Sequence, residues 1–451
     1  MEIRVKEIEI ELDAFDIYSI YREQKNLAFL DSNGDFKQLG KYSFIGLNPF
    51  LVFKGRLKQC YINDVLVEGD AFEKLRELIE KYKAENTTDL PMIGGCIGYF
   101  SYDYGLGLEG ISTHALEDVE LAHFCFIFYD NLLIFDHENK KKYLSACGIL
   151  SEAKESLEKI EGEIKNQGKV EDTRIKATTR VECSSNFTKE GYMEAVEKMR
   201  DYICSGDMYI ANMTQRFTAT THKDAYEIYK DLRKINPAPF SALMRLEDID
   251  IISSSPERFL KIYQGVVETR PIKGTRPRGK TPKEDAELKN QLLHSEKDKS
   301  ELLMIVDLER NDLSKVCKPH HVKVTELFQL EEYASVFHLV ATIRGELKED
   351  VDALDCFKAC FPGGSITGAP KIRAMEIIDE LEGLKRGLYT GCLGYFSFDG
   401  NGDFNIMIRS ILKKENQVYF GAGGGITWES CAAEEYQETL DKAKALMAVI
   451  G

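Results

Sequence analysis

The chain has 451 residues, 43% of them hydrophobic, which is enough for two or three ordinary domains or one large two-lobed unit. Its 59 Lys and Arg residues face 75 Asp and Glu residues, and the formal charge of −16 argues against nucleic acid or an anionic membrane as partner. No apolar run reaches membrane-spanning length and the N-terminus lacks a signal-peptide core, so we expect a cytoplasmic protein.

The first part of the chain predicts mainly strands. A helix is expected over residues 14–23 and a second, highly charged one over 151–166. Strands are expected over residues 3–12, 27–30, 42–46, 51–53, 92–104 and 124–135. Residues 168–185 hold few apolar side chains and no period, which is typical of a solvated linker. We therefore predict an N-terminal region over 1–180 and a C-terminal domain over 181–451.

The C-terminal domain begins with an amphipathic helix, which Thr188 can cap and Gly206 can end. A strand over residues 209–219 and a turn over 236–240 follow. Strands and helices then mix without a βαβ rhythm. This order predicts antiparallel sheets backed by helices, an α+β fold, rather than a doubly wound one.

The most distinctive stretch is residues 270–279, which hold Lys273 between Pro271 and Gly274. Proline fixes φ and lacks an N–H donor, and glycine permits backbone angles that other residues avoid. Residues 259–269 read as a strand with a turn inside it, so Lys273 is expected where a strand opens into a loop, a common place for reactive groups. On spacing alone, a basic surface turn is the better interpretation.

This stretch resembles the signature of the chorismate-utilising enzymes, in the form carried by their aminodeoxychorismate synthase branch. The related anthranilate synthases typically have alanine where this chain has Lys273. The resemblance covers most of the chain and is dense from residue 187 onward. It implies two antiparallel β-sheets packed as a sandwich and flanked by helices, with the N-terminal region packed against a chorismate-binding catalytic domain.

Glu257 lies shortly before Lys273 and is the candidate acid. A carboxyl group beside an apolar ring site can stay protonated and act as a general acid. Alone, Glu257 reads as an exposed turn residue paired with Arg258. Together with Lys273 it matches the family's acid and nucleophile at the family's spacing, so the resemblance implies that both residues are catalytic.

Two acidic pairs are each spaced three residues apart on expected helices, Asp298 with Glu301 and Glu435 with Glu438. Residues i and i+3 share a helix face, and two such faces across a cleft would form an all-oxygen site suited to Mg²⁺. Each pair alone more often forms a solvated face, as Glu438 would with Lys442. The resemblance implies direct metal contact for Glu301 and Glu438 and outer positions for Asp298 and Glu435.

The resemblance also implies a chorismate pocket. Its loop over residues 362–371 precedes a helix, whose free N–H groups can hold an anion, although a tight turn explains that loop as well. The glycine run over 421–426 reads as a hairpin, whereas in the family its amides bind the substrate carboxylates. The implied substrate-binding residues are Thr367, Gly368, His338, Tyr395, Arg409, Gly423, Gly424, Gly425 and, less securely, Lys371. The charged stretch over 307–312 is interpreted as a structural helix end.

These residues allow the hydroxyl of chorismate to be replaced by an amino group. Mg²⁺ would polarise the ring carboxylate, and Glu257 would protonate the departing hydroxyl. Lys273, in its neutral form, would attack the ring and form an intermediate that ammonia opens. The product would be 4-amino-4-deoxychorismate, the precursor of p-aminobenzoate and folate. We recognise no glutamine amidotransferase domain in the chain, so a separate amidotransferase subunit is expected to supply ammonia.

Three alternatives stay open at this point. Anthranilate synthase component I is the nearest, and Lys273 is the residue that argues against it. Isochorismate and salicylate synthases use water in place of ammonia and a lysine base elsewhere. A catalytically silent chorismate-binding subunit would lack the intact acid, nucleophile and metal positions. A further ligand, tryptophan, is implied by a regulatory or structural pocket at Asp31, Ser32, Tyr42, Ser43, Pro237 and Phe240, although the family's usual leucine-leucine-glutamate-serine run differs here.

Overall fold

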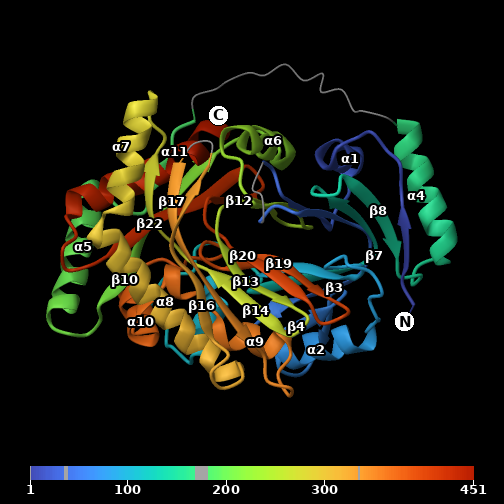
Figure 1. Cartoon of the computed structure of the whole chain (residues 1–451), viewed down its shortest axis with the longest axis horizontal. Coiled ribbons are helices and arrows are strands. Elements are labelled where there is room, and N and C mark those ends of the chain that lie inside the picture. Colours follow the sequence, from blue (N-terminus) through green and yellow to red (C-terminus); the bar gives the residue numbers. More distant parts are fainter. Residues whose placement is uncertain (1, 35–38, 168–180, 334–335) are drawn as a thin grey trace.

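The computed structural model describes residues 2–34, 39–167, 181–333 and 336–451. Figure 1 shows strands in the middle of the molecule and helices around them, with α1 and α4 on one side and α5, α7, α8 and α10 on the other. The helices are α1 (Ala14–Tyr21), α2 (Ala71–Lys81), α3 (Tyr102–Leu108), α4 (Ala153–Gln167), α5 (Lys189–Cys204), α6 (Ala225–Ile235), α7 (Pro282–Leu293), α8 (Glu296–Val316), α9 (Ala353–Cys360), α10 (Lys371–Glu382) and α11 (Ala432–Val449), with a 3₁₀ turn η1 (Gly364–Ile366).

The described strands are all linked by hydrogen-bonded pairing. In the first part of the chain they are β1 (Arg4–Glu7), β2 (Leu27–Asp31), β3 (Tyr42–Arg56), β4 (Gln59–Ile62), β5 (Val65–Val67), β6 (Gly95–Phe100), β7 (Phe124–Asp136) and β8 (Lys141–Ala146). After the predicted linker they are β9 (Ser184–Ser185), β10 (Ile210–Thr220), β11 (Phe240–Arg245), β12 (Asp250–Ser255), β13 (Arg258–Tyr263), β14 (Val266–Arg270), β15 (Ile272–Pro277), β16 (Lys323–Glu332), β17 (Val336–Glu346), β18 (Gly368–Ala369), β19 (Cys392–Ser397), β20 (Gly402–Ile406), β21 (Ser410–Lys414) and β22 (Gln417–Ile426).

Strands from the two parts of the chain pair directly. β2 pairs antiparallel with β11, and β6 pairs antiparallel with β19. The predicted α+β class is confirmed, because antiparallel strands dominate and the helices lie outside them. The division of the strands into two packed sheets stays a prediction. The predicted domain boundary at residue 180 lies outside the described residues, as do residues 168–180 of the predicted linker.

Helix starts follow the capping signals in the sequence. Thr188 Oγ1 accepts a hydrogen bond of 3.0 Å from Gly191 N at the start of α5, and Ser295 Oγ accepts one of 3.2 Å from Asp298 N at the start of α8. Each cap satisfies a backbone donor that has no partner inside its helix. Gly206, with φ of +87°, follows the last turn of α5 as the sequence predicts.

A cluster of aromatic side chains packs α9 onto the strands. The ring of Phe357 in α9 lies with its centroid 4.9 Å from that of Phe100, 5.0 Å from Phe404 and 5.4 Å from Phe259. These three partners belong to β6, β20 and β13, so one side chain joins strands from both parts of the chain. Buried aromatic pairs add specific edge contacts to the burial of area. The loop that follows α9 is fixed at its start by this packing.

Several predicted strands have other bounds in the structure. The expected strands over 42–46 and 51–53 form one long strand, β3, and the expected strand over 92–104 shortens to β6, followed by helix α3. The glycine run over 421–426 is part of β22 and is therefore not a hairpin turn. In the described part of the chain, no helix is long and apolar enough to cross a membrane.

Candidate active site

Lys273 lies on β15 beside a bulge that requires glycine. The register between β15 and β17 shifts between Lys273 and Thr275, so Gly274 bulges out between them. Gly274 has φ of +75°, and a Cβ at this position would lie 2.9 Å from Cβ of Asp298. Positive φ and the close approach both disfavour any side chain. The bulge therefore sets the direction of Lys273 and seats its strand against the start of α8.

The amino group of Lys273 reaches two other segments. Its Nζ donates a hydrogen bond of 3.3 Å to the carbonyl of Ser365. It also lies 3.2 Å from the point that a Cβ of Gly425 would occupy, and Glu301 Oε2 lies 3.7 Å from that point. Lys273, Glu301 and the bare backbone of Gly425 therefore meet at one place. A ligand can approach that backbone closely because no side chain covers it.

The neighbouring glycine of β22 faces the second acidic pair. The point that a Cβ of Gly424 would occupy lies 3.1 Å from both Glu435 Oε2 and Glu438 Oε1. Lys297 Nζ lies between the two helices, 4.0 Å from Glu301 Oε1 and 3.8 Å from Glu435 Oε1. The structure thus brings three of the four predicted metal residues to one wall, made by α8, β22 and α11. We call this the carboxylate wall: Glu301, Glu435 and Glu438.

Burial and mutual repulsion shape the charge of the carboxylate wall. Burial raises the pKa of Glu301, and Lys273 opposes the rise. Burial also raises the pKa of Glu435, and Glu438 adds to the rise. Burial acts on Glu438 in the same direction, but Lys442, at 2.5 Å, outweighs it and the pKa of Glu438 is lowered. The wall therefore gathers negative charge that a cation would relieve.

Asp298 adds to the burial effect that raises the pKa of Glu301, and it is itself paired with an arginine. Its Oδ2 accepts a hydrogen bond of 2.8 Å from Arg276 Nη2. In the described part of the chain, no three His, Cys, Asp or Glu side chains converge tightly enough to hold a metal ion as they stand. The donor chemistry of the wall nevertheless fits Mg²⁺, because it offers only carboxylate oxygens and excess negative charge. Metal binding stays a prediction.

Glu257 is a buried carboxyl group with a raised pKa. It is 4% exposed, and its Oε1 has no hydrogen-bond partner among the described residues. Burial raises the pKa of Glu257 to about 6, while the Ser365 hydroxyl and the Lys273 ammonium oppose the rise. Its backbone is fixed on both sides, since Glu257 N donates to Ser255 Oγ at 3.2 Å and its carbonyl accepts from Ile406 N at 3.1 Å. Such a carboxyl can hold a proton and release it during a reaction.

The loop before α10 is held by its own hydrogen bonds. Thr367 Oγ1 donates to the carbonyl of Gly363 at 2.8 Å, and the Thr367 carbonyl accepts from Asn212 N at 2.8 Å. Gly368 faces the backbone of β10 so closely that a Cβ would lie 2.2 Å from the Ile210 carbonyl oxygen. The loop is therefore locked to β10, the strand that also pairs with the glycines of β22.

Lys371 has a structural set of partners. Its Nζ donates to Asp312 Oδ2 at 2.5 Å, to the carbonyl of Pro362 at 2.9 Å and to that of Cys360 at 3.0 Å. An ammonium group has three hydrogens, so all of them are used. Lys371 therefore anchors the loop in this structure, and the substrate contact predicted for it would require one of these bonds to break.

His338 and Arg409 lie near each other beside β15. His338 Nδ1 lies 2.9 Å from Thr275 Oγ1, and burial lowers the pKa of His338 to about 4, with Arg409 adding to the effect. His338 is therefore a neutral hydrogen-bonding group at neutral pH. Arg409 Nη1 donates to the carbonyl of Lys442 in α11. The pair offers one neutral and one cationic donor on the same side as the carboxylate wall.

A family model described as chorismate binding enzyme matches residues 27–448. This chain belongs to that family. It is 37% identical over 421 residues to aminodeoxychorismate synthase component 1 of Bacillus subtilis (strain 168), covering 91% of this chain and 89% of the relative. It is 36% identical over 453 residues to anthranilate synthase component 1 of Acetivibrio thermocellus, covering 96% and 92%.

A solved structure has the same fold over nearly its whole length. The crystal structure of anthranilate synthase component I from Streptococcus pneumoniae TIGR4 superposes with a TM-score of 0.81 at 32% sequence identity, and the match covers 95% of this chain and 96% of that one. Relatives of both branches of the chorismate binding family therefore lie at similar distances. Overall similarity gives the family and the fold, and leaves the choice of product to individual residues.

A cavity of about 90 Å³ is lined by residues of β2, β3, β11, β19 and β20 and holds much of the predicted tryptophan pocket. Asp31, Ser32, Tyr42 and Phe240 line it, as predicted, together with Pro239 in place of the predicted Pro237. Ser43 lies behind Asp31, with its Oγ 3.4 Å from Asp31 Oδ1. We call this space the Asp31 cavity; whether tryptophan binds in it stays a prediction.

Tyr395 also lines the Asp31 cavity, which changes its expected role. Its ring centroid lies 5.5 Å from that of Phe44, another residue of the cavity wall. Burial raises the pKa of Tyr395 well above its usual value, so its hydroxyl stays protonated. The structure thus groups Tyr395 with the Asp31 cavity and not with Lys273, because its side chain leaves β19 toward β3.

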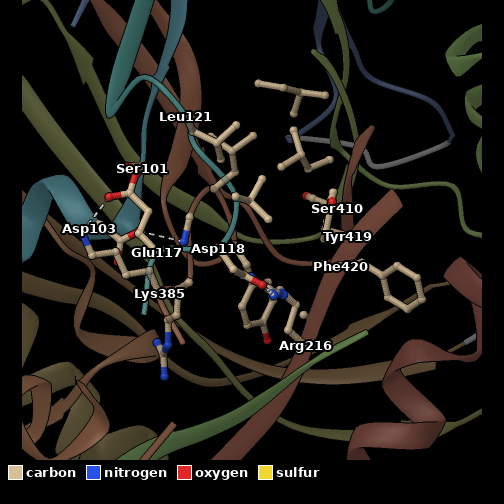
Figure 2. A pocket seen from close by; sticks show the side chains of 18 of the residues that line it. Ser101, Asp103, Glu117, Asp118, Leu121, Arg216, Lys385, Ser410, Tyr419 and Phe420 are labelled. Carbon is tan, nitrogen blue, oxygen red and sulfur yellow. Dashed lines mark hydrogen bonds and ion pairs between the residues drawn. The ribbon is translucent and has the colours of Figure 1, made fainter. Parts of the chain in front are cut away.

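Another cavity, of about 40 Å³, is shown in Figure 2. Ion pairs form part of its wall, with Lys385 Nζ 3.1 Å from Glu117 Oε2 and Arg216 bound to Asp118. Asp103 Oδ1 is buried there with no hydrogen-bond partner among the described residues. Gly421, the first residue of the predicted carboxylate-binding run, lines this cavity, whereas Lys273, Glu257 and the predicted metal residues do not.

The sequence predicted no functional role for Ser365, Lys297 or Glu309. Lys297 stands four residues before Glu301, a spacing that predicts a helical ion pair and could have been used. Ser365 reaches Glu257 only because the loop folds back, and no local pattern signals that. Glu309 belongs to the stretch predicted to be a charged helix end, but its carboxyl group is buried, with 8% of the residue exposed. That part of the prediction is wrong, because α8 continues past Glu309 and packs this face inward.

Proposed function

We propose that the chain is component I of an aminodeoxychorismate synthase, an enzyme that converts chorismate and ammonia to 4-amino-4-deoxychorismate for p-aminobenzoate and folate synthesis. The position of Lys273 carries the proposal. Its amino group lies within reach of Ser365, close to Glu301 and the bare backbone of Gly425, with the buried Glu257 among its charged neighbours. A nucleophile and an acid around an anion-binding backbone are the parts that this substitution requires.

The covalent step uses both residues. The Lys273 nitrogen forms a bond to the ring carbon next to the carboxylate-bearing carbon, the ring double bonds shift, and the C–O bond to the hydroxyl breaks. Glu257 gives its proton to that oxygen, which leaves as water, and Glu257 becomes a carboxylate. Ammonia then bonds to the carbon that lost the hydroxyl, and the double bonds shift back. Lys273 leaves with its electron pair, and the proton released by the amine returns to Glu257.

The carboxylate wall would hold Mg²⁺ through Glu301 and Glu438, with Glu435 in support. When bound, Mg²⁺ polarises the ring carboxylate of the substrate, and its charge offsets the carboxylates around Lys273. Lys297, which now lies between Glu301 and Glu435, would give way to the cation. The all-carboxylate donor set supports this assignment. Burial raises the pKa of Glu435 and repulsion from Glu438 adds to the rise, and a bound cation would relieve that repulsion.

The remaining residues would orient the substrate. Amides of β22 at Gly423, Gly424 and Gly425 offer backbone donors to a carboxylate. Arg409 supplies a forked cation for the same group, and neutral His338 can donate near the ring without adding charge. Thr367 and Gly368 would form the opposite rim, through a loop that is fixed to β10.

Partners follow from the proposed chemistry. Ammonia would come from a separate glutamine amidotransferase subunit, since the described residues form one chorismate-binding unit. Tryptophan is the ligand we propose for the Asp31 cavity, in a structural or regulatory role. The aromatic rings of Phe44, Phe240 and Tyr395 in the cavity wall support an aromatic ligand.

Anthranilate synthase component I is the second candidate. The similar identity of the Acetivibrio thermocellus relative and the close match to the Streptococcus pneumoniae structure favour it equally. The two reactions differ in the carbon that receives ammonia. Direct attack by ammonia beside the carboxylate-bearing carbon would give anthranilate, and a lysine nitrogen at that carbon blocks this route.

Trapping the covalent intermediate tests the proposal. Enzyme is incubated with chorismate and Mg²⁺ without ammonia, and the digest is analysed by mass spectrometry. We expect the peptide that contains Lys273 to carry the substrate mass less one water, and ammonium to remove it. Efficient turnover to an aminated product with no adduct on Lys273 under any quench would overturn the lysine mechanism.

A further inference from the structure

Glu309 is a buried carboxyl group that the proposed mechanism does not use. It lies on α8, two turns after the carboxylate wall, and is 8% exposed. Its Oε2 lies 3.0 Å from Thr269 Oγ1, and that hydroxyl oxygen lies 2.7 Å from the carbonyl oxygen of Phe259. Thr269 is itself 4% exposed, so solvent reaches neither contact freely.

Counting hydrogens decides the protonation state of Glu309. A threonine hydroxyl has one hydrogen, and a carbonyl oxygen can only accept. The 2.7 Å contact with Phe259 therefore uses the hydrogen of Thr269. The 3.0 Å contact with Glu309 then needs a hydrogen from Glu309 itself. If Glu309 were a carboxylate, two oxygens in one of these contacts would face each other with no hydrogen between them.

The surroundings of Glu309 favour the same state. Burial raises the pKa of Glu309 to about 8, Glu257 and Asp312 add to the rise, and Thr269 and Lys371 oppose it. Asp312 is already paired with Lys371 at 2.5 Å. The charged neighbours of Glu309 are thus Glu257 and an ion pair whose charges offset each other. A second buried carboxylate next to Glu257 would be costly without its own cation.

Glu309 and Glu257 each neighbour a residue of the short segment that Lys273 contacts. The point that a Cβ of Gly364 would occupy lies 3.5 Å from Glu309 Cγ. The next residue, Ser365, lies beside Glu257 and accepts the Lys273 hydrogen bond through its carbonyl. Glu309 therefore influences the acid through its protonation state and through the backbone that carries Thr269 and Gly364.

We propose that Glu309 is a neutral carboxylic acid that donates its hydrogen to Thr269 and keeps a second negative charge away from Glu257. It is a positioning residue: it touches no reacting atom, and Glu257 can take up the negative charge of the acid step because Glu309 has none. The assignment of Glu257 as the acid rests on the proposed function, whereas the protonation state of Glu309 does not.

Thermal unfolding as a function of pH tests the protonation state. The pKa of Glu309 rises from 4.5 to about 8 on folding. Its contribution is therefore fully present below pH 4.5 and is lost as the pH rises through about 8. In Glu309→Gln the amide stays neutral and can still donate to Thr269. We expect the Tm of this variant, relative to wild type, to rise steadily between about pH 5 and about pH 9.

The matched control is Glu296→Gln on the same helix, whose side chain is 87% exposed. Its Tm difference from wild type should stay flat over the same pH range. A Tm difference for Glu309→Gln that is equally flat, or that falls with pH, would mean that Glu309 is ionised in the folded protein and would overturn the proposal. Neither measurement involves chorismate, so failure of the proposed function leaves this result intact.

Activity separates the positioning role from simple packing. At neutral pH, Glu309→Gln should keep kcat within about threefold, because it preserves neutrality and the donor. Glu309→Val removes the donor, and Glu309→Asp shortens the reach to Thr269, and both should lower kcat by at least about tenfold, the equivalent of 1.4 kcal/mol. Rescue by glutamine alone supports the role. A tenfold or larger loss in a folded Glu309→Gln variant would show that the carboxyl proton itself is needed, which contradicts the proposal.

Discussion

The candidate active site and the Asp31 cavity differ in how their buried carboxyl groups are satisfied. Asp31, 2% exposed, accepts hydrogen bonds of 2.8 Å from Tyr229 Oη and 2.7 Å from Arg233 Nε. Glu257, 4% exposed, keeps one oxygen without a partner among the described residues. Asp31 is neutralised by a fixed cation, whereas the pKa of Glu257 is raised to about 6.

This difference indicates two kinds of site. A buried carboxylate that is paired with its own cation and hydroxyl is part of the framework, because its charge is already neutralised before a ligand binds. A buried carboxyl group with an oxygen that lacks a hydrogen-bond partner is unfavourable as an anion, so its pKa rises. The surrounding fold must offset this cost, and the raised pKa lets the group donate a proton in a reaction. The family match covers both regions alike, so the contrast comes from the side chains and not from the fold.

Lys273→Ala should cause the largest loss of activity, because it removes the proposed nucleophile of the candidate active site. Without the nitrogen, no adduct can form, and formation of aminodeoxychorismate should fall by more than about 10⁴-fold, beyond the usual range of acid–base effects. Intact mass spectrometry with chorismate and a quenched product assay measure both quantities. An adduct that persists on Lys273→Ala would remove the nucleophile assignment.

Glu257→Gln should lower kcat by about 10²–10⁴-fold, because the leaving hydroxyl loses its proton donor. The wild-type enzyme needs protonated Glu257, whose pKa is about 6, so kcat/KM should fall as the pH rises through about 6. This decrease of kcat/KM with rising pH should be absent from Glu257→Gln. An identical pH profile of kcat/KM in both proteins would mean that another group causes the decrease, which contradicts the assignment of Glu257 as the acid.

Removal of one wall carboxylate should weaken magnesium binding. Glu301→Gln and Glu438→Gln should each raise the Mg²⁺ concentration for half-maximal rate by about 10–100-fold. Calorimetric titration of Mg²⁺ into the protein without substrate gives a readout apart from activity. Glu434→Gln, an exposed neighbour at the start of α11, is the control and should match wild type. Full activity in the presence of a chelator would contradict the metal assignment.

Asp31→Asn should have the smallest effect on catalysis. We expect kcat to stay within about twofold, while stability falls by about 1–3 kcal/mol because a buried charged hydrogen bond to Arg233 is lost. Chemical denaturation and steady-state assays, each with and without tryptophan, measure the two effects. A large loss of kcat in a folded variant would mean that the two sites are coupled.

Much of the arrangement followed from sequence, for reasons that differ between residues. Lys273 and Glu257 were predicted from the resemblance to the chorismate-utilising enzymes, because their local pattern alone favours surface turns. The acidic pairs carry a local signal, which is i, i+3 spacing on helices. Helix α5 and the strands around the turn at Gln264 were predicted because caps, stripes and turn residues are local as well.

Other features depend on packing that no local pattern encodes. Lys371 reads as a substrate ligand, yet three acceptors from distant segments saturate it. Tyr395 lies on a strand, β19, but the cavity that its side chain lines depends on how β19 pairs with β6. Sequence spacing does not encode that pairing. Glu309 was interpreted as part of a charged helix end, because spacing along a helix does not reveal whether a carboxyl group is protonated.

The most direct test of the account is the product formed from chorismate, Mg²⁺ and ammonium at alkaline pH, followed by fluorescence with and without an added aminodeoxychorismate lyase. We predict p-aminobenzoate that appears only with the lyase, together with no anthranilate. Anthranilate formed without the lyase would contradict the account, because it would mean that Lys273 does not determine the carbon that ammonia attacks.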